Sequence, residues 1–476
     1  MTPHLFLVIG GSGDLTTRKL LPALYAILPR RGCHILAAAT GDRDDASYRA
    51  LAAQALTASG IPAAAAAAWV AENVSYHQVS HDGAFDDLAE RMGSLDATHH
   101  LGGNRVLYLA LPPAAFAGTI ERLGRAGLGR GTGWTRIVVE KPFGSDLESA
   151  RQINDALHQH FSEGQIFRID HYLGKETVQN LLVFRFTNPI FEASWNRDRV
   201  ERIEITVAET LDVTGRGAYY DRTGVLADMV QSHLTQLLTL VAMEAPSAFS
   251  ADAVRDEKVK VLRSIREIPS DAVVVGQFGA GRVDGEPVAA YRDTAGVGPD
   301  STTPTYAAVR VWIDNWRWQG VPFLLRTGKA MPRRTTEVAV LFRRPPVCLF
   351  HGVVDNCIDS NDVLRLVLQP GEGFSLEVDV KEPGTSTRLR PIQLHFSYSE
   401  EFGEIPDAYE TLLADVIEGD QTLFVRRDEV EEAWRLYTPL LGTSPAVLPY
   451  AAGSWGPDAA ATLLPDGASG WATDSV

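Results

Sequence analysis

One octapeptide, RIDHYLGK at residues 168–175, gathers several groups that can take part in chemistry. Asp170, His171, Tyr172 and Lys175 follow a short apolar stretch that ends a predicted strand, and ligands of open α/β sheets bind at that edge. His171, Tyr172 and Lys175 can hydrogen-bond and neutralise a phosphate dianion. Asp170 would repel one and is better suited to orient a base. The octapeptide predicts a site for a phosphorylated substrate, with a solvated turn between domains as the alternative.

A second motif, GGSGDLTTRKLLPALY at residues 10–25, follows the first apolar run. A glycine-rich turn between a strand and a helix lets backbone N–H groups approach a pyrophosphate. Gly11 and Gly13 fit the first two positions of a dinucleotide fingerprint, but Thr16 stands at the third. A helix N-cap with a tight turn is the alternative. We assign cofactor binding to the loop residues Gly10, Gly11, Ser12, Gly13, Asp14 and Leu15.

The second apolar run ends in four charged residues, Asp42, Arg43, Asp44 and Asp45. A carboxylate there would accept hydrogen bonds from the ribose 2′-OH of NAD, whereas an arginine would accommodate the 2′-phosphate of NADP. Because both types are present, the segment predicts a ribose pocket and leaves the cofactor open between NADP and NAD.

The elements that must position these groups change in type along the chain. Short apolar runs at 5–9, 35–39, 106–111 and 137–139 alternate with helical patterns, which is typical of buried parallel strands. This alternation predicts a doubly wound parallel sheet in a dinucleotide-binding Rossmann domain, placed at residues 1–170.

Longer segments with period two follow after about residue 200. Ile203, Ile205 and Val207 alternate with polar residues, and similar runs recur to Phe396. They predict an α+β domain at residues 171–476 with one large, mainly antiparallel sheet. Helices are expected at 219–243 and 408–418, and the stretch after Ala451 is expected to fray.

Composition limits the function classes. A chain of 476 residues with a formal net charge of −16 argues against nucleic-acid binding and against attachment to an anionic membrane. Cys33, Cys348 and Cys357 lack metal or disulfide spacing, so we expect no metal and a reduced, cytoplasmic setting. We expect a soluble protein that is not exported, because MTPHLFLVIGG has no basic n-region and no small-residue cleavage site, and no stretch of about 18 apolar residues predicts a membrane span.

Taken together, the motifs resemble the glucose-6-phosphate dehydrogenase family. The resemblance covers nearly the whole chain and rests on further segments in family order: YLALPP at 108–113, VVEKPFG at 138–144, NPIFEASWNR at 188–197, YYDRTGVLADMVQSH at 219–233, RTGKAMPRR at 326–334 and AYETLLADVIEGD at 408–420. It implies a Rossmann domain followed by a β+α domain whose large sheet forms the dimer interface. A homodimer or homotetramer is expected.

The resemblance also implies roles. His233 matches the general base on the sugar C1 hydroxyl, and Asp170 the carboxylate that pairs with it. His171, Tyr172 and Lys175 match the residues that hold the phosphate. Lys141 matches a lysine that contacts substrate and cofactor, and Glu209 and Asp228 match residues that hydrogen-bond sugar hydroxyls. Lys329 and Arg334 match basic residues near the substrate, and Lys19 matches a lysine that contacts the cofactor.

Elementary chemistry agrees with the implied base, because oxidising a hemiacetal needs a group that is neutral near pH 7, and a carboxylate beside a histidine stabilises the imidazolium. Each residue alone has a plainer alternative. His233 could be a core histidine, Lys141 a solvated turn residue, and Glu209 and Asp228 surface charges. Lys329 and Arg334 could be exposed loop residues.

Two departures from the family matter. Thr40 stands where the family usually carries an arginine, with Arg43 three residues later, and Ser232 replaces an asparagine before the histidine. We expect an oxidoreductase that converts D-glucose 6-phosphate to 6-phosphoglucono-1,5-lactone with NADP or NAD, the first step of the oxidative pentose phosphate pathway. The alternatives are a dehydrogenase of another hexose 6-phosphate and a catalytically silent nucleotide-binding homologue.

Overall fold

The computed structural model describes residues 2–28, 32–81, 83–347, 349, 361–384, 388–403, 405–442 and 445–475. Cys348 and Cys357 therefore lie outside the described residues, and Cys33 is a free thiol. The chain divides into two units. The first comprises Met1–Lys175, Ala248–Arg255 and Pro406–Glu431, and the second comprises Glu176–Ser247, Asp256–Ile405 and Glu432–Val476.

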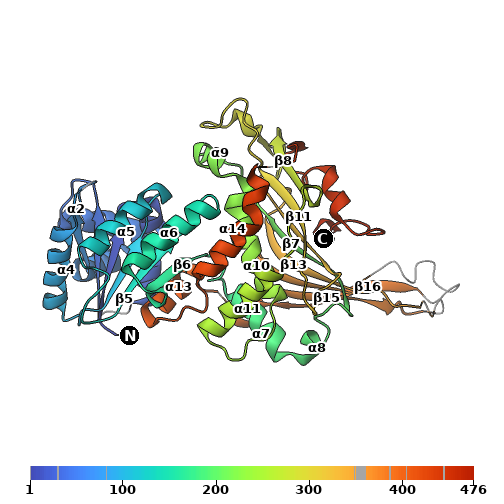
Figure 1. Cartoon of the computed structure of the whole chain (residues 1–476), viewed down its shortest axis with the longest axis horizontal. Coiled ribbons are helices and arrows are strands. Elements are labelled where there is room, and N and C mark those ends of the chain that lie inside the picture. Colours follow the sequence, from blue (N-terminus) through green and yellow to red (C-terminus); the bar gives the residue numbers. More distant parts are fainter. Residues whose placement is uncertain are drawn as a thin grey trace. The chain divides into compact units, whose positions relative to one another are not determined.

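The first unit contains a six-stranded, all-parallel sheet in the order β3-β2-β1-β4-β5-β6, drawn in blue to teal in Figure 1. Its strands are short and almost wholly buried, because helices cover both faces of the sheet. The bounds are β1 His4–Ile9, β2 Cys33–Ala39, β3 Val74–Gln78, β4 Arg105–Leu109, β5 Thr135–Glu140 and β6 Ile166–Ile169. The predicted doubly wound parallel sheet is confirmed.

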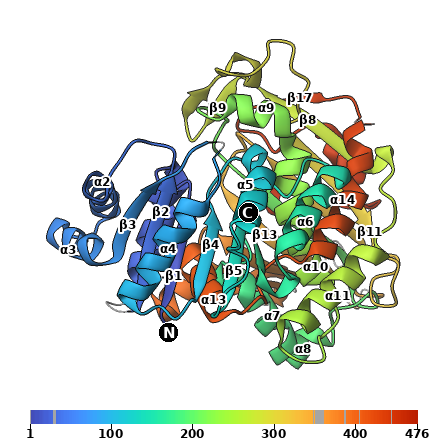
Figure 2. The same cartoon turned by 60° about the vertical axis from the view of Figure 1, so that its left-hand side comes forward.

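Alternate strand residues divide the core of this unit. Phe6, Val106 and Phe167 face one way and pack with helices α1, α2, α3 and α13, while α4 contacts β1 and β2, as Figure 2 shows. The helical bounds are η1 Thr16–Leu20, a π-helical turn, α1 Leu21–Ile27, α2 Asp45–Ala58, α3 Ala63–Asn73, α4 Asp86–His99, η2 Pro113–Ala115, α5 Phe116–Arg125, α6 Leu147–His160, η3 Glu163–Gln165 and α13 Ala408–Glu418.

The second unit contains a nine-stranded sheet in the order β16-β15-β14-β13-β7-β12-β11-β8-β17. It is mostly antiparallel, as the period-two segments predict, with parallel pairs at β7–β12 and β8–β17. The bounds are β7 Val200–Ala208, β8 Val273–Gly279, β11 Tyr306–Trp312, β12 Pro322–Gly328, β13 Thr335–Phe342, β14 Val363–Gln369, β15 Gly373–Lys381, β16 Leu389–Ser397 and β17 Leu448–Ala451. A separate hairpin joins β9 Gly281–Val283 to β10 Glu286–Val288.

Helices pack on this sheet through buried tryptophans whose indole N–H groups donate to backbone carbonyls. Trp195 donates to Val241 and Trp318 to Ala242, each at 2.8 Å, which ties both residues to the end of α10. The predicted helix at 219–243 forms, with a kink inside α9 at Gly224, which has a φ of +64°. The bounds are α7 Glu176–Thr187, α8 Pro189–Glu192, α9 Gly217–Val225, η4 Leu226–Leu234, a π-helix, α10 Thr235–Ala242, α11 Ala251–Ser264, α12 Tyr398–Phe402 and α14 Arg427–Gly442, with short 3₁₀ turns at η5 Ser270–Ala272, η6 Tyr291–Asp293, η7 Asp458–Leu463 and η8 Ala472–Ser475.

The expectation that the chain frays after Ala451 is wrong. The Thr473 hydroxyl donates to Glu337 at 2.6 Å, and Asp474 pairs with Arg326 at 2.6 Å. The Arg326 guanidinium also lies over the rings of Trp455 and Trp471, at 4.7 and 4.4 Å from their centres. The small residues of this segment concealed two aromatic anchors that bind it to the sheet.

Among the described residues, no helix has both the length and the apolar character that crossing a membrane requires.

Candidate active site

The glycine loop after β1 is closed by backbone contacts that only glycine permits. Gly10 has a φ of +91°, and a Cβ atom there would lie 2.1 Å from the Ala110 carbonyl oxygen. A Cβ at Gly11 would lie 2.6 Å from that of Ala37 on β2. The Thr16 hydroxyl donates to the Gly10 carbonyl at 3.1 Å. Thr16, the departure from the fingerprint, therefore stabilises the turn that the motif requires.

A cavity of about 650 Å³ lies beside this loop. Ser12, Asp14 and Arg18 from the loop and η1 line it, together with Gln54 of α2. The opening has the size of a ligand such as a nucleotide, since small-molecule sites span roughly 300–1,000 Å³. Two of the predicted cofactor-loop residues, Ser12 and Asp14, therefore border this cavity. Lys19, predicted to contact the cofactor, forms an ion pair of 2.8 Å with Asp407, the N-cap of α13.

The four charges after β2 have separate tasks. Asp44 is the N-cap of α2, where its carboxylate accepts from the Ser47 N–H at 2.8 Å. Asp45 accepts from the Tyr76 N–H at 2.6 Å and pairs with Arg91 at 3.2 Å. Two of the three carboxylates are thus used by the fold. Asp42 and Arg43 remain, both exposed, as the charges that can meet a ribose or its phosphate.

The octapeptide after β6 forms a compact turn that places its four functional groups together. The Asp170 carboxylate, which is buried, accepts from the Tyr172 N–H at 3.0 Å. The His171 and Tyr172 rings have centres 5.0 Å apart, and the Lys175 ammonium lies 3.9 Å from the centre of the Tyr172 ring. Tyr172 is buried, whereas His171 and Lys175 keep partial exposure. Two basic groups and a phenol therefore meet at the carboxyl edge of the parallel sheet, as the phosphate-site prediction requires.

Gly174 allows α13 to pack against this turn. A Cβ atom at Gly174 would lie 2.6 Å from the Leu412 side chain and 2.7 Å from the Ala408 carbonyl oxygen. Because the second contact is with backbone, a larger residue would displace the turn or the helix.

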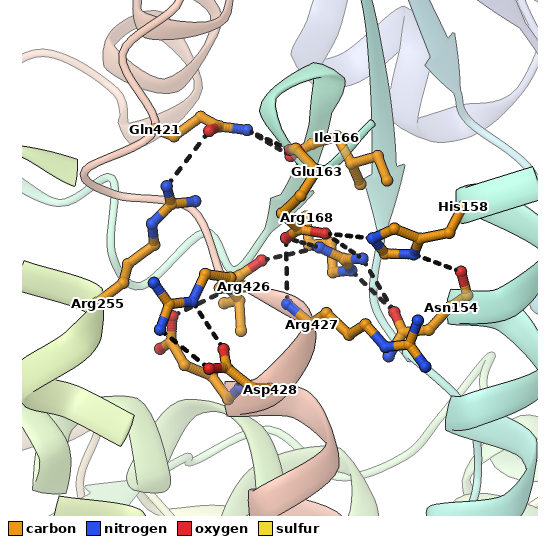
Figure 3. Close-up of polar contacts among 12 residues, drawn as sticks. Asn154, His158, Glu163, Ile166, Arg168, Arg255, Gln421, Arg426, Arg427 and Asp428 are labelled. Carbon is orange, nitrogen blue, oxygen red and sulfur yellow. Dashed lines mark hydrogen bonds and ion pairs between the residues drawn. The ribbon is translucent and has the colours of Figure 1, made fainter. Parts of the chain in front are cut away.

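Arg168, the first residue of the octapeptide, lies within β6 and holds this strand through a network of polar contacts (Figure 3). Its buried guanidinium donates to Glu163 at 2.7 Å and to Asn154 at 3.0 Å. Glu163 in turn accepts from the Arg427 backbone N–H at 3.1 Å, and the Gln421 amide donates to the Ile166 carbonyl at 2.8 Å. This network fixes the strand two residues before Asp170, so the carboxylate projects from a rigid element.

A second set of predicted residues gathers in the second unit. Glu209 follows β7, and Lys329 follows the parallel strand β12, so the two strand ends bring them into an ion pair of 2.5 Å. The Lys329 ammonium lies 5.4 Å from the ring centre of Tyr220. Burial, together with the charges of Asp228 and Glu209, raises the pKa of the Tyr220 phenol well above its usual value. Glu209, Asp228 and Lys329 therefore surround one buried tyrosine.

Tyr220 is not among the site residues predicted from the sequence, although it lies inside the YYDRTG motif. Its hydroxyl forms no hydrogen bond within the described part of the chain. His233 lies on the same π-helix as Asp228, five residues later, and is buried. The Ser232 hydroxyl donates to the Asp228 carbonyl at 2.7 Å, so the serine that replaces an asparagine serves the helix backbone. Arg334 is exposed just before β13.

Comparison with known families identifies relatives of both units. Residues 7–180 match the family described as "Glucose-6-phosphate dehydrogenase, NAD binding domain", and residues 182–472 match "Glucose-6-phosphate dehydrogenase, C-terminal domain". A glucose-6-phosphate 1-dehydrogenase of Treponema pallidum is 43% identical over 99% of this chain and 95% of its own length. One of Mycolicibacterium smegmatis is 44% identical over 96% and 95%.

Solved structures agree. A glucose-6-phosphate dehydrogenase in complex with its substrate glucose-6-phosphate matches with a TM-score of 0.90 and 34% identity, covering 99% of both chains. A glucose-6-phosphate 1-dehydrogenase from Mycobacterium avium matches with a TM-score of 0.83, also at 34% identity, covering 97% of both chains.

Proposed function

Because the chain belongs to the glucose-6-phosphate dehydrogenase family, we propose that it oxidises D-glucose 6-phosphate to 6-phosphoglucono-1,5-lactone with NADP, and that His233 is the base. It is an NAD(P)-dependent oxidoreductase. One structural observation carries the assignment to this chain: Asp170, His171, Tyr172 and Lys175 meet at the carboxyl edge of the parallel sheet.

The proposed reaction removes two electrons and two hydrogen nuclei from C1 and its hydroxyl group. His233 takes the hydroxyl proton on a ring nitrogen as the C1–H bond breaks and the C1=O bond of the lactone forms. A nicotinamide cofactor held at the glycine loop would supply the acceptor for the hydride that leaves C1. Asp170 serves as the carboxylate partner that stabilises the His233 imidazolium, as in other carboxylate–histidine pairs.

Substrate binding divides between the two sets of residues. His171, Tyr172 and Lys175 hold the 6-phosphate, since two basic groups and a phenol supply donors and positive charge. Glu209 and Asp228 accept from sugar hydroxyls, and Lys141 at the end of β5 contacts both substrate and cofactor. Lys329 and Arg334 add positive charge near the substrate, with Lys329 held in place by Glu209.

For the cofactor, the glycine loop from Gly10 to Leu15 supplies the backbone that approaches the pyrophosphate, and Lys19 adds a positive charge at the helix start. Arg43 is the residue that accommodates the 2′-phosphate of NADP. The fold supports this choice, because Asp44 and Asp45 are engaged with α2 and β3 and leave only Asp42 to favour the 2′-OH of NAD.

We also propose a cytoplasmic homodimer or homotetramer that assembles through the large sheet. At its edge, β16 keeps much of its surface exposed, including Leu394 with 56% of its surface accessible. An exposed apolar edge strand is a ready surface for pairing with another chain. Light scattering of the purified protein distinguishes monomer, dimer and tetramer.

The test of the function is the rate at which the reduced-nicotinamide absorbance grows with glucose 6-phosphate, with NADP and NAD in parallel. We expect turnover with glucose 6-phosphate and much less with glucosamine 6-phosphate or free glucose. Arg43→Ala should raise the KM for NADP about tenfold or more, the size of a lost charged contact, and leave that for NAD unchanged. Arg125→Ala, an exposed arginine on α5, is the control. Cofactor binding without reduction by any sugar phosphate would overturn the proposal.

A further inference from the structure

Glu140 is a carboxyl group at the sheet edge to which no role has been given above. It ends β5 and is paired in register with Ile169 of β6. The residues that follow these two partners are Lys141 and Asp170, so Glu140 directly precedes the first and lies beside the strand that leads to the second. The residue keeps partial exposure at its surface, but its carboxyl group lies among protein atoms.

Two phenols from other elements converge on one oxygen of this carboxyl group. The Tyr108 hydroxyl of β4, which is fully buried, and the Tyr409 hydroxyl of α13 both donate to Glu140 Oε1, the latter at 3.2 Å. Tyr108 lies on the neighbouring strand, where it pairs with Val138. The three side chains therefore tie β4, β5 and α13 together at the point where the Lys141 loop begins.

We propose that Glu140 is a positioning residue for Lys141, and that its ionised form, held by Tyr108 and Tyr409, is the one that supports substrate turnover. This inference rests on the proposed function of the site. An ionised carboxylate is the better acceptor for two O–H donors, and its charge favours the Lys141 ammonium at the sheet edge. When the carboxyl group takes up a proton, it loses that charge, and its neutral oxygen is a weaker acceptor for the two phenols.

The surroundings bring this ionisation close to neutral pH. Burial raises the pKa of Glu140 to about 7, and Asp170 adds to the rise, while the hydrogen bonds from Tyr108 and Tyr409 and the charge of Lys141 oppose it. Among the described residues, the titratable groups that act most on Glu140 are thus Tyr108 of β4, Tyr409 of α13, Lys141 directly after β5 and Asp170 in the turn after β6. The burial of each phenol and the nearby charge of Glu140 raise the pKa of Tyr108 and that of Tyr409. Neither phenol therefore ionises near neutral pH, where Glu140 does.

The experiment is the pH dependence of kcat/KM for glucose 6-phosphate in the wild type and in Glu140→Gln. Protonation of Glu140 should lower the wild-type value by about tenfold in addition to the loss from protonation of His233, so the acidic limb is steeper in the wild type than in the variant, which shows the His233 loss alone. At pH 8 we expect a KM about tenfold higher in Glu140→Gln with a smaller change in kcat. Glu140→Asp should recover part of this loss. A role confined to packing would lower activity equally at every pH and leave the slope unchanged, which would overturn the proposal.

Tyr409→Phe is the second variant, at a partly exposed position. Removing one phenol donor destabilises the ionised carboxylate, so the acidic limb should move to higher pH. An unmoved limb in a folded Tyr409→Phe protein counts against the proposal, even if Glu140→Gln fails to fold.

Infrared difference spectra of the carboxyl band, taken across neutral pH without substrate, provide a readout that does not depend on turnover. A band that titrates near pH 7 in the wild type and is lost in Glu140→Gln supports the inference even if glucose 6-phosphate is not the substrate. Absence of that titration refutes it, whatever the outcome of the sugar-phosphate assay.

Discussion

Lys329 and Glu209 form an ion pair of 2.5 Å between the ends of two parallel neighbouring strands, β12 and β7. The Glu209 N–H also donates to the Gly328 carbonyl at 3.0 Å, so backbone pairing continues to the pair itself. Both residues were predicted to lie near the sugar, and the fold links them directly. The ion pair restricts the motion of both side chains before a sugar binds, so less conformational entropy is lost on binding than with two unpaired side chains.

This pair predicts non-additive kinetics. Lys329→Met and Glu209→Gln should each raise the KM for glucose 6-phosphate about tenfold, whereas the double variant should lose less than the product of the two effects. Each single change leaves a partly buried charge without its partner, which the double change does not. Steady-state kinetics of the four proteins measures the coupling. Purely multiplicative losses would mean that the two residues act separately.

His233→Asn should lower kcat by roughly 10²- to 10⁴-fold and leave KM nearly unchanged, since a base acts only in the transition state. His233 is buried, so the folded state needs a check of its own. Thermal unfolding and fluorescence titration with NADPH supply it. A folded variant that binds NADPH and turns over at the wild-type rate would remove His233 from the mechanism.

Gly174→Ala tests the packing behind the phosphate turn. The new Cβ atom would lie 2.7 Å from the Ala408 carbonyl oxygen, so the turn or α13 must move. We expect a loss of about 1–3 kcal/mol in the free energy of unfolding and a higher KM for glucose 6-phosphate. Gly164→Ala is the matched control, because a Cβ atom there meets nothing within 4 Å. Equal stability of both variants would mean that α13 yields without cost.

Much of this architecture is legible in the sequence because it depends on local pattern. The run at 5–9 predicts β1 within one residue, and the alternation at Ile203 predicts β7, since burial of one or both faces is written into neighbouring residues. The octapeptide at 168–175 likewise shows its chemistry directly, because all four groups follow one strand.

Other features depend on partners that are distant in the chain. Nothing near Asp44 reveals that it caps α2, and nothing near Asp45 reveals that it accepts from the Tyr76 N–H. The charges after β2 therefore could not decide between NADP and NAD from the sequence alone. The Tyr409 hydroxyl reaches Glu140 across 269 positions, and the composition of the last segment hides the stacking of Trp471 on Arg326. Such pairings follow from tertiary packing, which local periodicity does not encode.

The ionisation of Glu140 also predicts a pH dependence of stability. Its pKa is about 7 in the folded protein against an ordinary 4.5, so the folded state binds the proton more tightly than the unfolded state does. The folded state therefore loses stability as pH rises from about 4.5 to about 7, by at most about 3 kcal/mol, and the loss is complete above that range. Relative to Glu140→Gln, which does not ionise, the wild type should lose free energy of unfolding across this window and follow the variant outside it. Urea unfolding of both proteins between pH 4 and pH 8 measures the difference. A constant difference at every pH would show that Glu140 has the same pKa in the folded and unfolded proteins, which contradicts the prediction.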